Sequence, residues 1–403
     1  MMKRTRSPRR ARLSADAEQL VRLAAGLAES GSRLEDAYWD SHLAAQIDPL
    51  LAAHDEEALN AALDQLYHAN PPAFNVLADT IETRCENYQT GKKDDGLDSL
   101  LIVAPVLAWS RIGIPAGNVP KEVLLNLRAH LQAHVLAHNS KLALADFLFS
   151  QDQLPDDYSS SAALAGRLAM SARSGRDLHL DPKDLPQTIQ FLSDVRYMLG
   201  SVTVPRGAAL FRWQEMQETR KEIREGPQGG SQEQCAKQWR IQAGAALQAM
   251  LQGCAFELLP PQAYYSGCRE ADRKARPYAL RAAVTFLQTT LNAPATALRA
   301  VIAPFYEQRL EEFRVGFVLM QSGEMVHGVV WPLLDAEDES SDIATQIEAV
   351  LRESGVLDIV MLEQRFPLEY CDDCGAPLYP SPEGEPVHAE LPEQSEAAPR
   401  HLH

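Results

Sequence analysis

Hydrophobic positions along residues 14–90 recur at intervals of three and four, the spacing of amphipathic helices. Ser14 precedes an apolar run at a capping spacing and begins a first helix, and Arg33–Ala53 forms a second. Asp55 opens a third helix and Pro71 begins a fourth. Short connections are typical of antiparallel neighbours. The pattern therefore predicts a helical domain over these residues.

After a polar hinge at residues 91–96 the pattern changes to alternating strands and helices, which predicts an α+β module over residues 97–215. The order of elements, strand, helix, strand, hairpin, helix, strand, is ferredoxin-like with one extra strand. The expected elements are strand Leu100–Trp109, helix Lys121–His138, strand Leu142–Phe149, a hairpin of Arg167–Ala172 and Asp177–Leu180 around Ser174 and Gly175, a helix carrying Ile189, Leu192 and Val195, and strand Val202–Val204.

The same order returns later in the chain, in a stretch that aligns with the first module without a gap. The positions that coincide under one shift include Leu131 and Leu287, Leu142 and Leu298, and Phe149 and Phe305. The expected elements are strand Phe256–Tyr265, an amphipathic helix, an apolar run to Phe305, a hairpin of Phe313–Met320 and Met325–Leu333, a helix carrying Ile343, Ile347 and Val350, and strand Val356–Leu362.

We therefore predict an internal duplication, in which a second ferredoxin-like module covers residues 253–367 and a linker loop and helix cover residues 216–252. The alternative is that two unrelated α/β segments have similar composition. Residues 368–403 then form a separate C-terminal tail.

Composition adds that the 403-residue chain is 45% hydrophobic, enough for more than one domain, and carries a formal net charge of −17. The basic residues of a short N-terminal arm, residues 1–13, are Lys3, Arg4, Arg6, Arg9, Arg10 and Arg12. An acidic body repels phosphate backbones, so nucleic acid is an expected partner only through this arm, which could associate with RNA. The alternative is a disordered, solubilising leader. The sequence has neither a membrane-spanning run nor a secretory signal, so we expect a cytoplasmic protein without membrane contact.

Two of the cysteines stand at a chemically meaningful spacing, Cys371 and Cys374 in the run C-x-x-C-G-x-P-L-Y-P. This run resembles the knuckle of a zinc ribbon, in which two thiolates bind Zn²⁺ and backbone N–H groups of the turn donate to sulfur. The usual second C-x-x-C is missing, so His388, His401 and His403 are the candidates to complete a Cys₂His₂ set. The alternative is a metal-free turn.

Asp372 and Asp373 lie between the two cysteines, and carboxylates raise the pKa of a neighbouring thiol. We therefore expect a metal site in preference to a redox dithiol. The other four cysteines, which we expect to be buried thiols, are Cys85, Cys235, Cys254 and Cys268.

A second candidate site is the densest mixed-charge run of the chain, which we place at a loop and helix entrance. Its basic residues are Arg269, Arg273, Lys274 and Arg276. Arginines beside the free N–H groups of a helix entrance can bind a carboxylate or phosphate, so we predict a small anionic ligand. The alternative is a salt-bridged face, because Glu270 and Asp272 lie in the same run.

Several segments together resemble a known family. They are SGSRLED at residues 30–36, VPRGAALFRWQE, AYYSGCREADRKARPYALRAAV, WPL at residues 331–333 and the C-terminal CGAPLYP, HAELPE and APRHLH. On these motifs the chain resembles a beta-proteobacterial family classed as domain of unknown function 2863. The resemblance implies a bacterial cytoplasmic protein with no assigned activity, and it supplies no catalytic residues.

No familiar catalytic signature is present, which favours a non-enzymatic protein that binds a ligand or a protein partner, with a crevice between the two modules and a structural zinc site. The alternative is a metal-dependent hydrolase or transferase. In that case Cys371, Cys374 and one histidine would hold zinc and leave a coordination position for water.

Overall fold

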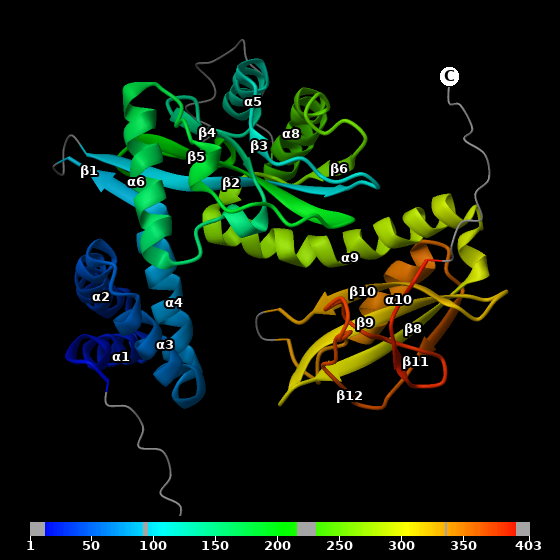
Figure 1. Cartoon of the computed structure of the whole chain (residues 1–403). Helices are drawn as coiled ribbons and strands as arrows, with labels where there is room; N and C mark the ends of the chain where they lie inside the picture. The colour runs from blue at the N-terminus through cyan, green and yellow to red at the C-terminus, as the bar shows by residue number, and fades with distance from the viewer. Residues whose placement is uncertain (1–12, 92–95, 216–230, 335–336, 392–403) are drawn as a thin grey trace, which may run out of the picture.

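A computed structural model of the chain describes residues 13–91, 96–215, 231–334 and 337–391, and it has a mixed α+β fold (Figure 1). The N-terminal helices pack together at one side, and a larger sheet lies beside them. The C-terminal part of the chain forms a second, smaller sheet. The α+β class expected from the sequence is confirmed. The predicted domain boundaries stay predictions.

The N-terminal helices follow the predicted pattern: α1 Ala15–Ala28, α2 Arg33–Ala53, α3 Glu56–Ala69 and α4 Pro71–Glu86. The side chains of Ser14 and Asp55 accept hydrogen bonds from the first turns of α1 and α3, so both predicted caps are confirmed. Leu20, Ile47 and Leu59 are fully buried between the helices, as the three-and-four spacing requires.

The larger sheet has the order β1-β2-β5-β4-β3, and β6 and β7 also pair with β2. Its strands are β1 Asn87–Thr90, β2 Leu97–Trp109, β3 Gly117–Asn118, β4 Lys141–Phe149, β5 Ser193–Pro205, β6 Ala255–Leu258 and β7 Gln262–Ala263. Helices α5 (Lys121–His134) and α8 (Gln232–Leu247) pack on one face, and α6 (Tyr158–Ser174) and α9 (Tyr264–Leu291) on the other. Both faces are therefore buried.

The hairpin predicted at Arg167–Ala172 and Asp177–Leu180 is wrong, because the first of these segments belongs to helix α6. Asp157 caps the start of α6, and Gly175, with φ 69°, ends it in the left-handed conformation. Glycine at such a position stops a helix as readily as it turns a hairpin. The alanine-rich stretch before it buries one helical face, which decides for the helix.

The helix predicted through Ile189 and Val195 is also wrong, because strand β5 begins at Ser193. Successive side chains of β5 enter the two different cores of the sheet, so its apolar residues Tyr197, Met198 and Leu199 follow one another without alternation. Gly200, which stands between the predicted helix and the predicted strand, lies inside β5. A Cβ atom there would lie 2.8 Å from the backbone oxygen of Ala143 on the neighbouring strand.

The smaller sheet has the order β10-β9-β8-β11, and β12 also pairs with β8. Its elements are β8 Leu298–Tyr306, β9 Leu310–Leu319, β10 Met325–Pro332, α10 Ile343–Glu353, β11 Asp358–Met361 and β12 Phe366–Pro367. The predicted hairpin and the helix and strand that follow it are confirmed. Helices α9 and α10 cover one face of this sheet.

The strand predicted at Phe256–Tyr265 does not open the second module. Its residues form β6 and β7, which pair with β2 of the larger sheet, and Tyr264 already begins α9. Helix α9 contains 28 residues and runs from the larger sheet to the smaller one (Figure 1). The expected ferredoxin-like order therefore lacks its first strand in the smaller sheet.

The expected duplication matches the structure over one helix and one strand only. Helices α5 and α9 carry the aligned residues Leu131 and Leu287. Strands β4 and β8 follow these helices at nearly the positions that the sequence alignment predicts. Beyond this unit β4 leads to helix α6, whereas β8 leads directly to the antiparallel strand β9. The flanking strands are thus joined differently, and the two segments are not two copies of one module.

The face of the smaller sheet opposite its helices is covered by a tail hairpin, strands β13 (Tyr379–Pro380) and β14 (Pro386–Val387). Gly316 on β9 and Gly328 on β10 are cross-strand partners beneath it. A Cβ atom on Gly328 would lie 2.3 Å from the ring of Tyr379, and one on Gly316 would lie 2.7 Å from the backbone oxygen of Pro380. Only glycine lets the tail hairpin approach the sheet this closely.

Candidate metal centre

Residues 370–377 form a closed turn, the cysteine turn, between β12 and the tail hairpin. Tyr370 and Pro377 form an antiparallel bridge at its base. The backbone N–H of Cys371 donates to the oxygen of Ala376 at 2.8 Å, and the N–H of Gly375 donates to the oxygen of Cys371 at 2.8 Å. Gly375 has φ 71°, a conformation that glycine adopts without steric cost. The sequence therefore folds the two cysteines back toward each other.

The tail hairpin brings a third possible ligand to the cysteine turn. His388 follows β14, and its Nε2 lies 3.3 Å from the Sγ of Cys374. The two Sγ atoms and a ring nitrogen of His388 all lie within 4.8 Å of one another. On its other side the Nδ1 of His388 lies 3.1 Å from Oε1 of Glu390, a partner of the kind that orients metal-binding histidines.

These three residues lie close enough together to bind one metal ion. Ligand atoms of a tetrahedral zinc site stand roughly 3.5 to 3.8 Å apart, so the observed spacing needs little adjustment. Two sulfurs and one imidazole suit zinc, whereas calcium and magnesium prefer oxygen ligands. Within the described residues the group contains no fourth histidine, cysteine or carboxylate. The other predicted ligands, His401 and His403, lie outside the described residues.

The pKa of the Cys371 thiol lies below its ordinary value. The main causes are hydrogen bonds to its sulfur from the backbone N–H groups of Cys374 and then Asp373, while the charge of Asp373 acts weakly in the opposite direction. The charge of Asp373 does raise this pKa, as expected, but the net pKa of Cys371 is lowered because the amide donors outweigh the carboxylates. They consequently give no reason at Cys371 to prefer a metal site to a redox dithiol.

A cleft of about 620 Å³ lies beside the candidate ligands, with His388 in its wall. The acidic residues that line it are Glu324, Glu383, Glu385 and Glu390, and the apolar ones include Val318, Met325, Val387 and Leu391. The cleft lies between the tail hairpin and the turn that connects β9 and β10. Of the three candidate ligands, His388 alone lines this acidic and partly apolar space.

Sequence reasoning missed the side chain that holds the cysteine turn on the sheet, Arg314 of β9, which is fully buried. It lies in the strand FRVGFVL, where a cation interrupts an otherwise apolar run. Such an interruption is the one signal that could have identified it, because a charge inside a strand needs a fixed partner.

The mixed-charge run is not a helix entrance, because α9 begins at Tyr264 and the run lies within it. Arg269 donates to Glu82 of α4 at 2.7 Å, and Arg276 lies 2.6 Å from Glu337 and donates to the backbone oxygen of Pro332 at 2.9 Å. Arg273 and Lys274 each lie near Glu270, at 3.2 and 3.9 Å. These contacts are those of a salt-bridged face, and the binding of an anionic ligand stays a prediction.

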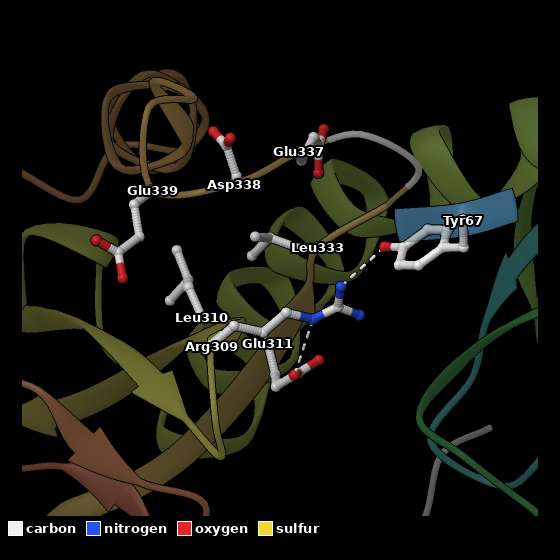
Figure 2. A pocket seen from close by; sticks show the side chains of 8 residues that line it. All are labelled: Tyr67, Arg309, Leu310, Glu311, Leu333, Glu337, Asp338 and Glu339. Carbon is white, nitrogen blue, oxygen red and sulfur yellow. Dashed lines mark hydrogen bonds and ion pairs between the residues drawn. The ribbon is translucent and has the colours of Figure 1, made fainter. Parts of the chain in front are cut away.

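A smaller cavity of about 300 Å³ lies between α3 and the smaller sheet (Figure 2). Arg309 reaches from the β8–β9 turn and donates to the hydroxyl of Tyr67 at 2.9 Å, while its Nε lies 3.2 Å from Glu311. Glu337, Asp338 and Glu339 line the same cavity. Glu311 is the fourth acidic residue in its lining, and none of the four basic residues of the predicted anion site lines it.

No helix in the ranges that the structure describes has the length and apolar character needed to cross a membrane. The family model described as "Protein of unknown function (DUF2863)" matches residues 5–402, in agreement with the resemblance of the sequence motifs. No curated protein and no solved structure matches the chain.

Proposed function

The chain belongs to the DUF2863 family, and we propose that it is a non-enzymatic binding protein whose C-terminal tail is organised by a structural zinc ion. Cys371, Cys374 and His388 hold the zinc, and His401 or His403 supplies the fourth ligand. The observation that carries the proposal is the convergence of two sulfurs and one imidazole nitrogen within 4.8 Å. The N–H donors to the sulfur of Cys371 are those that a zinc-bound thiolate uses.

A structural role fits the place of the ligands in the fold. Two of them come from the cysteine turn and one from the segment after β14, and the strands of the tail hairpin contain only two residues each. Hairpins this short are not stable alone, so a metal that joins their ends stabilises the cover of the smaller sheet. Free thiolates persist best in a reducing compartment, so a zinc site of this kind fits the expected cytoplasmic location.

The first experiment is metal analysis of the full-length protein purified under reducing conditions in the presence of zinc. We expect one zinc per chain, lost in Cys371→Ser and in His388→Ala. The matched control is Asp372→Asn, which changes an exposed residue of the same turn that is not among the proposed ligands. Wild-type protein that carries no metal, or a Cys371→Ser variant that retains it, would overturn the zinc site.

A second candidate function is metal-dependent hydrolysis or group transfer. It is favoured by one observation, the cleft of about 620 Å³ that has His388 in its wall. Three protein ligands leave a fourth position for water, and zinc lowers the pKa of bound water to about 7. In this case His388 would both hold the metal and face the substrate.

Chelation separates the two candidates. If zinc is structural, its removal lowers the thermal stability of the smaller sheet and exposes the tail to protease. If zinc is catalytic, removal leaves the fold intact but abolishes hydrolysis of simple carboxylic or phosphoric esters. Loss of stability without any ester hydrolysis by the zinc-loaded protein therefore excludes the second candidate for these substrate classes.

A further inference from the structure

Arg314 is a charged side chain in a place where charges are costly. It lies on β9, on the face of the smaller sheet beneath the cysteine turn, and none of its surface is exposed. A buried guanidinium destabilises a protein unless its donors are used well. Its Nε lies 2.6 Å from Oε1 of Glu312, which neutralises the charge; Nη1 and the face of the planar group make further contacts, whereas Nη2 has no hydrogen-bond partner in the described residues.

The Nη1 atom of Arg314 contacts both ends of the cysteine turn. It donates to the backbone oxygen of Glu369 at 2.7 Å and to that of Leu378 at 2.7 Å. Glu369 precedes the turn and Leu378 follows it, and the N–H of Leu378 donates to the oxygen of Glu369 at 3.2 Å. One nitrogen of Arg314 thus fixes the two backbone positions between which the cysteines are held.

The face of the guanidinium also contacts the turn. Its carbon lies 4.3 Å from the ring centre of Phe305 on β8 and 5.1 Å from that of Tyr370. Tyr370 directly precedes Cys371, so the stacked ring fixes the direction in which the chain enters the turn. A lysine could occupy the same site, but it lacks the planar group that stacks and donates at once.

The larger sheet contains a matched arginine that holds a loop outside the group of candidate metal ligands found in the described residues. Arg196 of β5 is also fully buried, and it donates to the backbone oxygens of Ile114 and Pro115 at 2.8 and 2.9 Å and pairs with Asp194. The loop that it holds contains no cysteine or histidine. Each of the two sheets therefore uses a fully buried arginine to hold a loop, and the one on the smaller sheet lies beneath the candidate metal ligands.

We propose that Arg314 is the positioning residue of the metal centre, so that the affinity of the site for zinc depends on the two carbonyl contacts of its guanidinium. This inference rests on the proposed zinc site. Arg314 does not contact the metal; it limits the separation of the turn's two ends, which sets the distance between the sulfurs of Cys371 and Cys374. Residues that orient metal ligands change metal affinity by about 10- to 100-fold when they are replaced.

The test compares Arg314→Met with Arg196→Met in the full-length protein. Zinc affinity is measured by competition with a chromophoric chelator, and the thiolate charge-transfer and d–d bands are measured with Co²⁺ in place of zinc. We expect Arg314→Met to weaken zinc binding by about 10- to 100-fold and to change the cobalt bands. Arg196→Met should lower thermal stability but leave both metal readouts at their wild-type values.

Two milder variants decide the question if Arg314→Met does not fold. Arg314→Lys keeps the charge, and Tyr370→Leu changes a side chain that is already 52% exposed. Each should weaken zinc binding less than Arg314→Met and shift the cobalt bands in the same sense. Wild-type zinc affinity and cobalt bands in folded Arg314→Met, or in both milder variants, would overturn the inference. Wild-type protein without any metal would instead overturn the proposed zinc site.

Discussion

The two sheets of this protein are covered in different ways. The larger sheet buries apolar side chains under helices on both faces, whereas the smaller one has helices, α9 and α10, on a single face. In the described part of the chain the other face of the smaller sheet carries the cysteine turn and the tail hairpin. Its apolar cluster there is small, with Phe305 and Phe366 as its large buried members.

The difference shows where this fold needs specific chemistry. A helix supplies a continuous apolar stripe, and burial of that stripe stabilises a sheet without any particular contact. A short, irregular tail has no such stripe, so it must be fixed at single points. Those points are the glycine pair Gly316 and Gly328, the guanidinium of Arg314 and the three candidate metal ligands.

The largest effect is expected from a change under the helices of the larger sheet. Trp239 of α8 is fully buried, and its Nε1 donates to the backbone oxygen of Leu259 at 3.0 Å. Trp239→Ala should lower the free energy of unfolding by about 3 to 5 kcal/mol, because it leaves a cavity and an unpaired carbonyl. Urea unfolding followed by circular dichroism measures this loss.

The same variant tests whether the two sheets are independent. Zinc content should be unchanged in folded Trp239→Ala, because α8 lies against the larger sheet and not against the cysteine turn. Loss of zinc together with loss of stability would mean that the tail depends on the larger sheet. This result would contradict the view that the two sheets are covered independently.

A somewhat smaller effect is expected from Gly328→Ala beneath the tail hairpin. The new methyl group would overlap the ring of Tyr379, so the hairpin must lift from the sheet, at a cost of about 3 kcal/mol or less. Limited proteolysis should cut the variant after β12 faster than the wild type. The matched control is Gly244→Ala in α8, whose nearest neighbour, Leu258, lies 4.0 Å away. This control should be neutral or slightly stabilising.

The next largest effect is a pH dependence of stability, which comes from one buried titratable group beside each sheet. Burial raises the pKa of Glu86, at the junction of α4 and α9, to about 7. Burial lowers the pKa of His327, on β10 beside Phe286, to about 4. Folding thus binds a proton at Glu86 between about pH 4.5 and 7, and it releases one at His327 between about pH 4 and 6.5.

The two groups therefore give opposite pH dependence. As pH falls from 7 to 5, Glu86 makes the junction of α4 and α9 more stable, and His327 makes the smaller sheet less stable, each by about 2 kcal/mol. Hydrogen exchange of peptides from α4 and from β9 and β10, corrected for the intrinsic rates, should show these slopes. Glu86→Gln should flatten the first and His327→Gln the second. Slopes of equal sign in the wild type would contradict the assignment.

The sequence predicted the parts of this fold in which one face is buried. The four N-terminal helices have a single apolar stripe each, and their caps stand at readable positions such as Ser14 and Asp55. The prediction was wrong for strand β5 because both of its faces are buried, which removes the alternation that identifies a strand. The strand predicted at residues 256–265 was assigned to the wrong sheet. Its partner, β2, lies more than a hundred residues away, and pairing between distant segments leaves no local pattern.

The candidate metal centre could be predicted in part for the same reason. Cys371 and Cys374 form a local motif, so their turn was readable from spacing. The choice among three histidines was not, because it depends on the tail hairpin that brings His388 to Cys374. Arg314 was missed because the carbonyls that it holds belong to residues more than fifty positions later in the chain.

The smallest effect is expected where the N-terminal helices touch the smaller sheet. The hydroxyl of Tyr67 accepts a hydrogen bond from Arg309, whose side chain is 67% exposed, so water can replace this contact at little cost (Figure 2). Tyr67→Phe should leave the unfolding midpoint and the zinc content unchanged. Glu82→Gln, which weakens the pair with the less exposed Arg269 under the larger sheet, should lower the midpoint measurably. If Tyr67→Phe instead destabilises the protein as much as Gly328→Ala does, the helical domain is a third cover of the smaller sheet. In that case the smaller sheet is not held only by contacts at single points on its second face, and its difference from the larger sheet is smaller than proposed.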